Sequence, residues 1–404
     1  MNRSVTETWS LCALGVVAMV AVALMLDGLD AQVLGLAIPA LTQEWGVTRA
    51  ELTPITAGSL VGMAIGATFG GWFGDRFGRR AGLIGSLLLF GVSTALASRV
   101  DSLPVFGLLR ALAGLGLGAA LPNGTALITE FTPARYRSVG ASIAMLSQPV
   151  GSLAAGLLAA ALIESVGWRG LFLIGGFTPL VVALVYLKTL PESPQFLAGR
   201  RDDGERASPR ALLAPALRRD SILLWLSGFM SLLALYTMLS WGPAMLASEG
   251  YPLSFAGSVV ATFSVGGITG SLLVGVLARR IGSRATQGLI GGVGIAAALV
   301  LILLFSAGRP STGAVLALMA CVGFSAAGSQ TTLYVLSSHL YPTWLRGTGI
   351  GATLGLGRLG AVASAWAGST ALDLGGAGAF FSLFALSIAV ATTGCMAISN
   401  QVRT

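Results

Sequence analysis

Apolar residues along the chain gather into runs of about 20, the length with which an α-helix crosses the hydrocarbon core of a bilayer. Short polar segments that hold most of the Arg residues separate the runs. The pattern predicts twelve transmembrane helices, over residues 11–39, 52–74, 82–98, 103–129, 138–163, 168–189, 220–247, 254–278, 285–306, 312–338, 347–371 and 376–398. The sequence therefore predicts an all-α membrane protein.

The longest polar interval, residues 191–219, divides the twelve runs into six and six. We therefore expect an N-terminal six-helix bundle over residues 1–190, a cytoplasmic linker over 191–219 and a C-terminal six-helix bundle over 220–404. Charges of both signs without apolar periodicity fill residues 200–206, which is typical of a solvated, mobile connector and not of a separate domain.

The two halves also repeat one another. Residues 71–80, after the second predicted helix, resemble residues 275–284 after the eighth, and residues 130–140 share Pro, Arg and Gly in step with residues 339–349. Two six-helix halves related by a repeat, with charges buried between helices, are typical of an alternating-access transporter.

Composition and charge support this picture. Only 10% of the 404 residues are charged and 54% are hydrophobic, which excludes an ordinary soluble protein. The net charge of +8 comes from Arg in short loops and not from a contiguous basic domain, so nucleic-acid binding is not indicated. With the N-terminus inside, 18 of the 24 basic residues fall in cytoplasmic segments and 4 in the opposite loops, which predicts that both termini are cytoplasmic.

The sequence offers no pattern for catalysis or metal binding. It has no Walker loop, no nucleophile with a base nearby and only one His, and its three Cys residues lie in apolar runs without metal-ligand spacing. We expect neither an enzyme nor a metal site nor a cofactor. Transport would then draw on an ion gradient.

Two acids, Asp27 and Asp30, lie inside the first predicted helix. Their i, i+3 spacing places both on one face, at a depth where a carboxylate costs at least ~2.5–3.5 kcal/mol. Arg110 in the fourth predicted helix lies about 12 Å from the Ser102 end, and Asp30 about 13 Å from the Pro39 end on the same side. We predict that Arg110 meets Asp30.

This arrangement suggests proton coupling through Asp27, Asp30 and Arg110. A carboxylate facing Arg is held ionised, whereas one that loses the Arg to a substrate anion takes up a proton more readily. The alternative is a structural ion pair that holds two helices together.

A second cation, Arg358, lies about 18 Å along its helix from Arg346, near the midplane, among small Gly residues. A guanidinium there suits a bidentate grip on a substrate carboxylate; the alternative is an ion pair with Asp27. Polar and aromatic residues at mid-depth complete the candidate binding site, which comprises Gln148, Tyr236, Trp241, Gln330 and Tyr334, with Pro149 and Trp366 as further cavity candidates. Trp241 and Trp366 are equally consistent with anchors at the membrane interface.

The loop after the second helix holds one acid and three Arg residues. Asp75, Arg76, Arg79 and Arg80 could form a set of ion pairs that acts as a cytoplasmic gate; the alternative is that the Arg residues only set topology. The gate prediction also includes Glu130 and Arg137, with Arg346 and His339 as their repeat partners.

These motifs resemble a known family. The Gly-x-x-x-Asp-Arg-x-Gly-Arg-Arg loop at 71–80 and the Pro-Glu-Ser-Pro motif at 191–194 resemble the major facilitator superfamily, and residues 27–30, 114–123 and 341–360 resemble its aromatic acid:proton symporters. The resemblance implies the major facilitator fold and import of an aromatic carboxylate (a benzoate, hydroxybenzoate or hydroxyphenylpropionate) with protons, by a monomer in the inner membrane of a bacterium. Two other classes stay open: an exporter of drugs or metabolites with the same fold, and a non-transporting membrane sensor, which the short termini disfavour.

Overall fold

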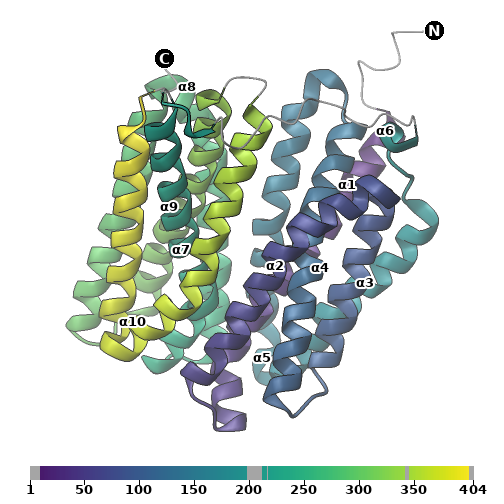
Figure 1. The fold of residues 1–404 in the computed structure, drawn as a ribbon. Helices are drawn as coiled ribbons and strands as arrows, with labels where there is room; N and C mark the ends of the chain where they lie inside the picture. The colour runs from purple at the N-terminus through teal and green to yellow at the C-terminus, as the bar shows by residue number, and fades with distance from the viewer. Residues whose placement is uncertain (1–9, 198–211, 216, 342–344, 400–404) are drawn as a thin grey trace. The chain divides into compact units, whose positions relative to one another are not determined.

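A computed structural model of the chain describes residues 10–197, 212–215, 217–341 and 345–399, and this part is built from helices (Figure 1). By contacts between residues the chain divides into two compact units, Met1–Asp202 and Asp203–Thr404. The division falls inside the predicted linker, most of which lies outside the described residues. The described residues that flank this part are mixed: Ser193 and Leu212 are each 1% exposed, whereas Leu197 and Leu213 are 72% and 47% exposed.

The N-terminal unit contains six of the helices and one short 3-10 turn. Its helices are α1 (Leu11–Trp45), α2 (Arg49–Phe77), α3 (Arg79–Ala97), α4 (Leu103–Phe131), α5 (Arg137–Thr189) and the single-turn α6 (Pro194–Leu197), with the turn at Ala134–Tyr136. The backbone of α5 leaves helical geometry at Gly167, where φ is 66° and ψ is −178°. This break turns α5 into two consecutive helices.

The C-terminal unit contains α7 (Arg218–Ser248), α8 (Leu253–Ser306), α9 (Thr312–Leu340) and α10 (Arg346–Ala397). Glycines break two of them: α8 at Gly282, with φ of 78°, and α10 at Gly375 and Gly376, the second with φ of 55°. Glycine adopts these positive φ values without the steric penalty that a Cβ brings.

Nine helices in the described part of the chain are long and apolar enough to cross a membrane. Three of them, α5, α8 and α10, are 53, 54 and 52 residues long and each contains a glycine break, so each supplies two spans. The twelve predicted transmembrane helices are thereby confirmed. One boundary differs, because α1 continues past Pro39 to Trp45 with the proline inside the helix.

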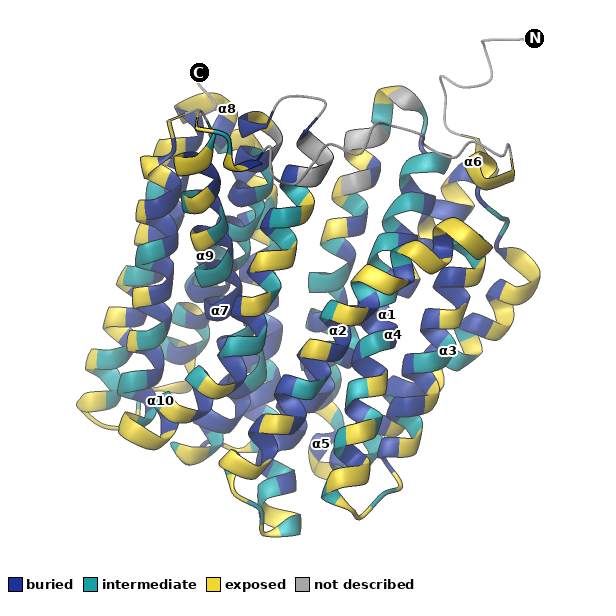
Figure 2. Cartoon of the chain, viewed as in Figure 1, coloured by how far each residue is buried: buried dark blue, intermediate teal, exposed yellow. Residues whose placement is uncertain are grey.

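Large apolar side chains cover the outer faces of the helices. Figure 2 shows exposed positions along many of the long helices, and these include Leu157 and Leu184 in one unit and Leu303 and Leu386 in the other. Such exposure is costly in water but not in lipid, where a helix can present apolar side chains on every side that faces the bilayer.

Inside the N-terminal unit, glycines allow close contact between α1 and α5. A Cβ on Gly151 would overlap the Met25 carbonyl oxygen, and a Cβ on Gly28 would overlap that of Gln148. Helices in lipid associate through small residues of this kind because backbones can then pack closely. This contact sets the position of the acids on α1 relative to α5.

We expect Gly151→Ala to lower the thermal stability of the detergent-purified protein, because the new methyl group forces the two backbones apart at a cost of about 1–3 kcal/mol. Gly15→Ala on the same helix pair is the control, since no atom lies within 4 Å of a Cβ placed there. Equal melting temperatures for the two variants would show that α1 and α5 tolerate a wider spacing.

Candidate functional site

The predicted meeting of the first and fourth helices is present in the structure. Arg110 Nη2 lies 3.1 Å from Asp30 Oδ2, and the two side chains are 1% and 0% exposed. Arg110 Nη1 donates a hydrogen bond of 3.1 Å to Thr94 Oγ1 on α3. The guanidinium carbon lies 5.4 Å from the centroid of the Phe172 ring on α5. Four helices therefore converge on one buried cation.

The pair between Arg110 and Asp30 is not fully satisfied. Among the described residues, Asp30 Oδ1 and Arg110 Nε are buried without a hydrogen-bond partner. A buried ion pair in which some polar atoms lack a hydrogen-bond partner contributes little net stability, because the cost of desolvation offsets the Coulomb attraction. Asp30 Oδ1 therefore keeps unused acceptor capacity inside the protein.

The second acid on α1, Asp27, is 1% exposed and accepts a hydrogen bond of 3.1 Å from Gln148 Nε2 on α5. Ser152 Oγ, one turn further along α5, donates to the Gly28 carbonyl at 3.2 Å. The structure thus places Gln148, a predicted substrate-binding residue, beside Asp27. A role for Gln148 in binding substrate stays a prediction.

An aromatic cluster of Trp45, Phe106, Trp168 and Phe172 lies between Arg110 and one end of the unit. The ring of Trp168 lies 5.5 Å from Phe172, 5.7 Å from Trp45 and 5.9 Å from Phe106, each in edge-to-face geometry. These arrangements are the favourable ones for aromatic pairs. The cluster supports the ring over which Arg110 lies.

Next to this cluster, Arg169 ties together three segments. Its Nη2 lies 2.8 Å from Glu44 Oε1 and 2.6 Å from Asp101 Oδ1, and its Nη1 donates to the carbonyl oxygens of Ser98 and Val100 at 3.1 and 3.2 Å. Arg169 is one of the four basic residues that the sequence analysis counted in the loops opposite the cytoplasm. The structure shows that it also joins the ends of α1 and α3 to the start of the second half of α5.

The predicted gate residues make contacts within the N-terminal unit. Asp75 and Arg79 form an ion pair one helical turn apart. The Arg80 backbone N–H donates to Glu192 Oε1 at 3.0 Å, and its Nη2 donates to the Leu187 carbonyl at 2.5 Å.

Two further predicted gate residues, Glu130 and Arg76, also contact side chains of the N-terminal unit. Ser193 Oγ is hydrogen-bonded to Glu130, and the Arg76 guanidinium lies 5.7 Å from the Trp72 and Phe77 ring centroids. The side chains of Arg137 and Arg346 lie outside the described residues. A gating role for the whole set stays a prediction.

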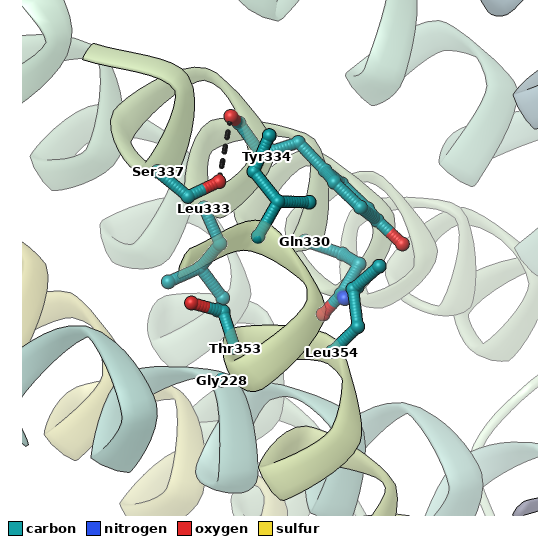
Figure 3. A pocket seen from close by; sticks show the side chains of 8 residues that line it. Gly228, Gln330, Leu333, Tyr334, Ser337, Thr353 and Leu354 are labelled. Carbon is teal, nitrogen blue, oxygen red and sulfur yellow. Dashed lines mark hydrogen bonds between the residues drawn. The ribbon is translucent and has the colours of Figure 1, made fainter. Parts of the chain in front are cut away.

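In the C-terminal unit, a small pocket lies between α7, α9 and α10. It is lined by Gly228, Gln330, Leu333, Tyr334, Ser337, Ile350, Thr353 and Leu354 (Figure 3). Two predicted binding residues, Gln330 and Tyr334, thus line the same pocket. Ser231 Oγ on α7 donates to Gln330 Oε1 at 3.1 Å.

Arg358 belongs to the same face of α10 as the pocket. Ile350, Leu354 and Arg358 are spaced i, i+4 and i+8, so they follow one another along one side of the helix. The guanidinium interacts electrostatically with the Tyr334 phenol. Arg358 itself is not among the residues that line the pocket, and its role in binding substrate stays a prediction.

The remaining aromatic candidates do not line this pocket. Trp241 is fully buried, and a Cβ on Gly368 would lie close to its indole ring, so it packs between α7 and α10. Trp366 is 50% exposed, which fits a membrane anchor. Tyr236 on α7 is partly buried outside the pocket lining. Their assignment to substrate stays a prediction.

A family model described as Major Facilitator Superfamily matches residues 20–365. The chain belongs to this superfamily. As a member of the Major Facilitator Superfamily it is a multi-pass membrane transporter and not an enzyme. Among the described residues, no group of three or more His, Cys, Asp or Glu side chains is arranged to hold a metal ion.

Curated relatives within the superfamily match most of the chain. The 4-hydroxybenzoate transporter PcaK of Pseudomonas aeruginosa is 35% identical over 382 residues, which cover 87% of this chain and 84% of that protein. The gallate transporter of Pseudomonas putida is 31% identical, and the match covers 92% of this chain and 89% of that protein. The 3-(3-hydroxy-phenyl)propionate transporter of Escherichia coli is 32% identical, and the match covers 87% of this chain and 85% of that protein.

Solved structures of the superfamily show the same fold. The inward open conformation of the xylose transporter XylE from E. coli superposes with a TM-score of 0.77 over 97% of each chain, at 20% sequence identity. This similarity confirms the predicted major facilitator fold and says nothing about substrate.

The sequence analysis did not identify several residues of the site. Thr94 and Phe172 hold Arg110, and Ser337 and Thr353 line the pocket, yet none of them stands out in an apolar helix. Glu192 was noticed only as part of a motif. A signal for it existed, because a carboxylate followed by Ser-Pro after a long apolar run is well placed to cap a neighbouring helix N-terminus.

Proposed function

We propose that the protein is a proton-coupled secondary transporter that imports an aromatic carboxylate by alternating access. The relatives named above transport 4-hydroxybenzoate, gallate and 3-(3-hydroxy-phenyl)propionate, and each of these is an aromatic ring with a carboxylate. Shared superfamily membership supports the mechanism of transport, and these names support the class of substrate.

The buried contact between Arg110 and Asp30 is the observation that carries the proposal. A transporter that couples a proton to an anion needs an acid whose protonation depends on a nearby cation. Asp30 has one hydrogen-bonded oxygen and one without a partner among the described residues. Protonation of Asp30 would release the Arg110 guanidinium, and a change in the partner of Arg110 would change the proton affinity of Asp30.

We further propose that the proton gradient alone supplies the energy, without a cofactor, and that the transporter works as a monomer. The excess of Arg in alternate loops supports insertion into the inner membrane of a bacterium with both termini in the cytoplasm. In this orientation Asp75, Arg79 and Arg80 lie on the cytoplasmic side, where their contacts would form and break as the transporter changes conformation.

Uptake of radiolabelled 4-hydroxybenzoate into proteoliposomes with an inward proton gradient tests the proposed function. We expect accumulation that an uncoupler abolishes, and inhibition by other aromatic acids but not by the corresponding amide or primary alcohol. An exporter of uncharged or cationic compounds would show no counterflow of aromatic acids. That result would overturn the proposal.

We expect Arg358→Lys to raise the KM for the acid at least about tenfold, because the ammonium group cannot reproduce the planar two-point contact of a guanidinium with a carboxylate. Arg309→Lys is the control, since Arg309 lies over the Tyr251 ring at 4.3 Å in the segment between α8 and α9. If Arg358→Lys transports with an unchanged KM, Arg358 does not hold the carboxylate.

A further inference from the structure

The guanidinium of Arg110 divides its hydrogen bonds between two helices. Nη2 donates to Asp30 Oδ2 on α1 at 3.1 Å, and Nη1 donates to Thr94 Oγ1 on α3 at 3.1 Å. All three residues are at most 1% exposed. An Arg side chain and a carboxylate frequently pair through two parallel bonds, whereas Arg110 and Asp30 make a one-point contact.

The one-point contact leaves hydrogen-bonding capacity unused on both partners. Among the described residues, Asp30 Oδ1 and Arg110 Nε are buried without a hydrogen-bond partner. A buried acceptor without a donor costs free energy, which a second bond from the same guanidinium would recover. Another contact must therefore hold the guanidinium in its present orientation.

Thr94 is the residue that makes this contact. The guanidinium is a rigid plane, so the bond from Nη1 to Thr94 fixes the direction in which its other donors point. The Phe172 ring lies 5.4 Å from the guanidinium carbon and stabilises the cation through its face, without accepting a bond in the plane. Thr94 is thus the acceptor that competes with Asp30 for the donors of Arg110.

Other charged groups near the contact are few in the part of the chain that the structure describes. The first helix contributes Asp27, one turn from Asp30. The helices α2 and α3 carry charged residues only near their ends. The second half of α5 contributes Arg169, which is paired with Glu44 and Asp101. The charge on Asp30 therefore depends chiefly on the bonds that it accepts from the α4 guanidinium.

We propose that Thr94 is a positioning residue for proton coupling, which holds Arg110 in a one-point contact and so keeps Asp30 able to bind a proton at the pH at which the transporter works. The inference rests on the proposed function and assigns it a further residue. A two-point contact would hold Asp30 ionised more firmly, because each charge-assisted bond favours the carboxylate over the acid.

Thr94 also keeps a bond to Arg110 after the proton is bound. When Asp30 takes up a proton from water, the net charge of the pair changes from zero to +1. Arg110 then loses its ionic partner but keeps the bond to Thr94 and the contact with Phe172. The cation stays in place for an incoming carboxylate.

The test measures the initial rate of proton-driven 4-hydroxybenzoate uptake into proteoliposomes as a function of external pH. Thr94→Val keeps the shape and removes the acceptor, so the guanidinium turns to the second oxygen of Asp30. We expect half-maximal uptake to require at least about tenfold more protons, a shift of about one pH unit to lower pH, because an added Arg contact lowers the proton affinity of a carboxylate. Thr94→Ala should show the same shift. Thr94→Ser keeps the oxygen and should retain the wild-type midpoint.

Infrared spectra of the purified full-length protein give a second measurement that does not depend on transport. The carboxylic-acid band that disappears in Asp30→Asn belongs to Asp30, and its pH titration should shift to lower pH in Thr94→Val. Thr56→Val is the matched control, because Thr56 is 3% exposed on α2 of the same unit and donates to the Leu52 carbonyl at 3.3 Å.

A wild-type midpoint, or a shift to higher pH, in Thr94→Val and Thr94→Ala proteins that still exchange substrate would overturn the positioning role and leave the proposed function standing. If neither variant exchanges substrate, an unshifted Asp30 band in the infrared titration would overturn the role. An equal shift in Thr56→Val would assign the effect to helix packing and would also reject it. A wild-type protein that accumulates no aromatic acid would overturn the proposed function, and with it the role of Thr94 in coupling.

Discussion

Arg110→Met should destabilise the protein by about 3–5 kcal/mol, the usual cost of leaving one member of a buried ion pair without its partner. Arg110 Nη2 is the hydrogen-bond donor to Asp30 among the described residues, and Asp30 is completely buried. Thr94 loses a donor as well, and the Phe172 ring loses the cation above it. Thermal unfolding in detergent would measure the loss.

A second substitution at the partner separates charge from packing. Adding Asp30→Leu to Arg110→Met removes the unpaired carboxylate, and we expect the double variant to regain most of the lost stability, because a neutral pair of similar volume is often as stable as a buried ion pair. Arg309→Met serves as the control for loss of an Arg. A double variant less stable than Arg110→Met would show that the ion pair itself stabilises the fold.

The contact between Asp30 and Arg110 could be predicted because the rise of an α-helix is constant. Two residues at equal depth on different helices lie in the same layer of the membrane, whatever the packing of the helices. Depth does not tell how each helix is rotated about its own axis. Thr94 and Phe172 were therefore missed, because only the packed structure shows which faces of α3 and α5 point at Arg110.

The twelve spans were predictable from apolar length, whereas the way they are joined was not. Gly167, Gly282 and Gly376 each mark a change of direction within a few residues, and a positive φ at one glycine is enough for the turn. Glu192 and Ser193 were grouped with the linker, yet they contact Arg80 and Glu130. Charge and polarity alone cannot distinguish a solvated segment from one that caps a helix.

In the C-terminal unit, Gln330 and Tyr334 were predicted as cavity residues because polar and aromatic side chains at mid-depth can contact an aromatic substrate. Ser337 and Thr353 carry no such signal, since a hydroxyl can bond a backbone carbonyl of its own helix. Both do so, and only the structure shows that these two residues also line a pocket. Trp241 shows the reverse case. As an aromatic residue at mid-depth it was a candidate for substrate binding, but its ring is packed against α10 near Gly368.

The largest effect on transport is expected from Asp30→Asn. Asparagine keeps the shape of the side chain and accepts a hydrogen bond from Arg110, but it cannot bind and release a proton. Proton-driven accumulation should therefore fall to the level of empty proteoliposomes, while exchange between equal internal and external pools of substrate persists. Exchange does not require net proton movement, so the two measurements separate coupling from binding and from folding.

Asp27 lies one helical turn away and accepts a hydrogen bond from Gln148, so Asp27→Asn and the double variant complete the experiment. If the two acids share the proton, each single variant retains part of the accumulation and the double variant none, because interacting acids titrate as a pair. Glu164→Gln, an exposed acid on α5, should behave like the wild type. Accumulation that survives at wild-type rates in the double variant would remove both acids from coupling, and the contact between Arg110 and Asp30 would then be a structural ion pair.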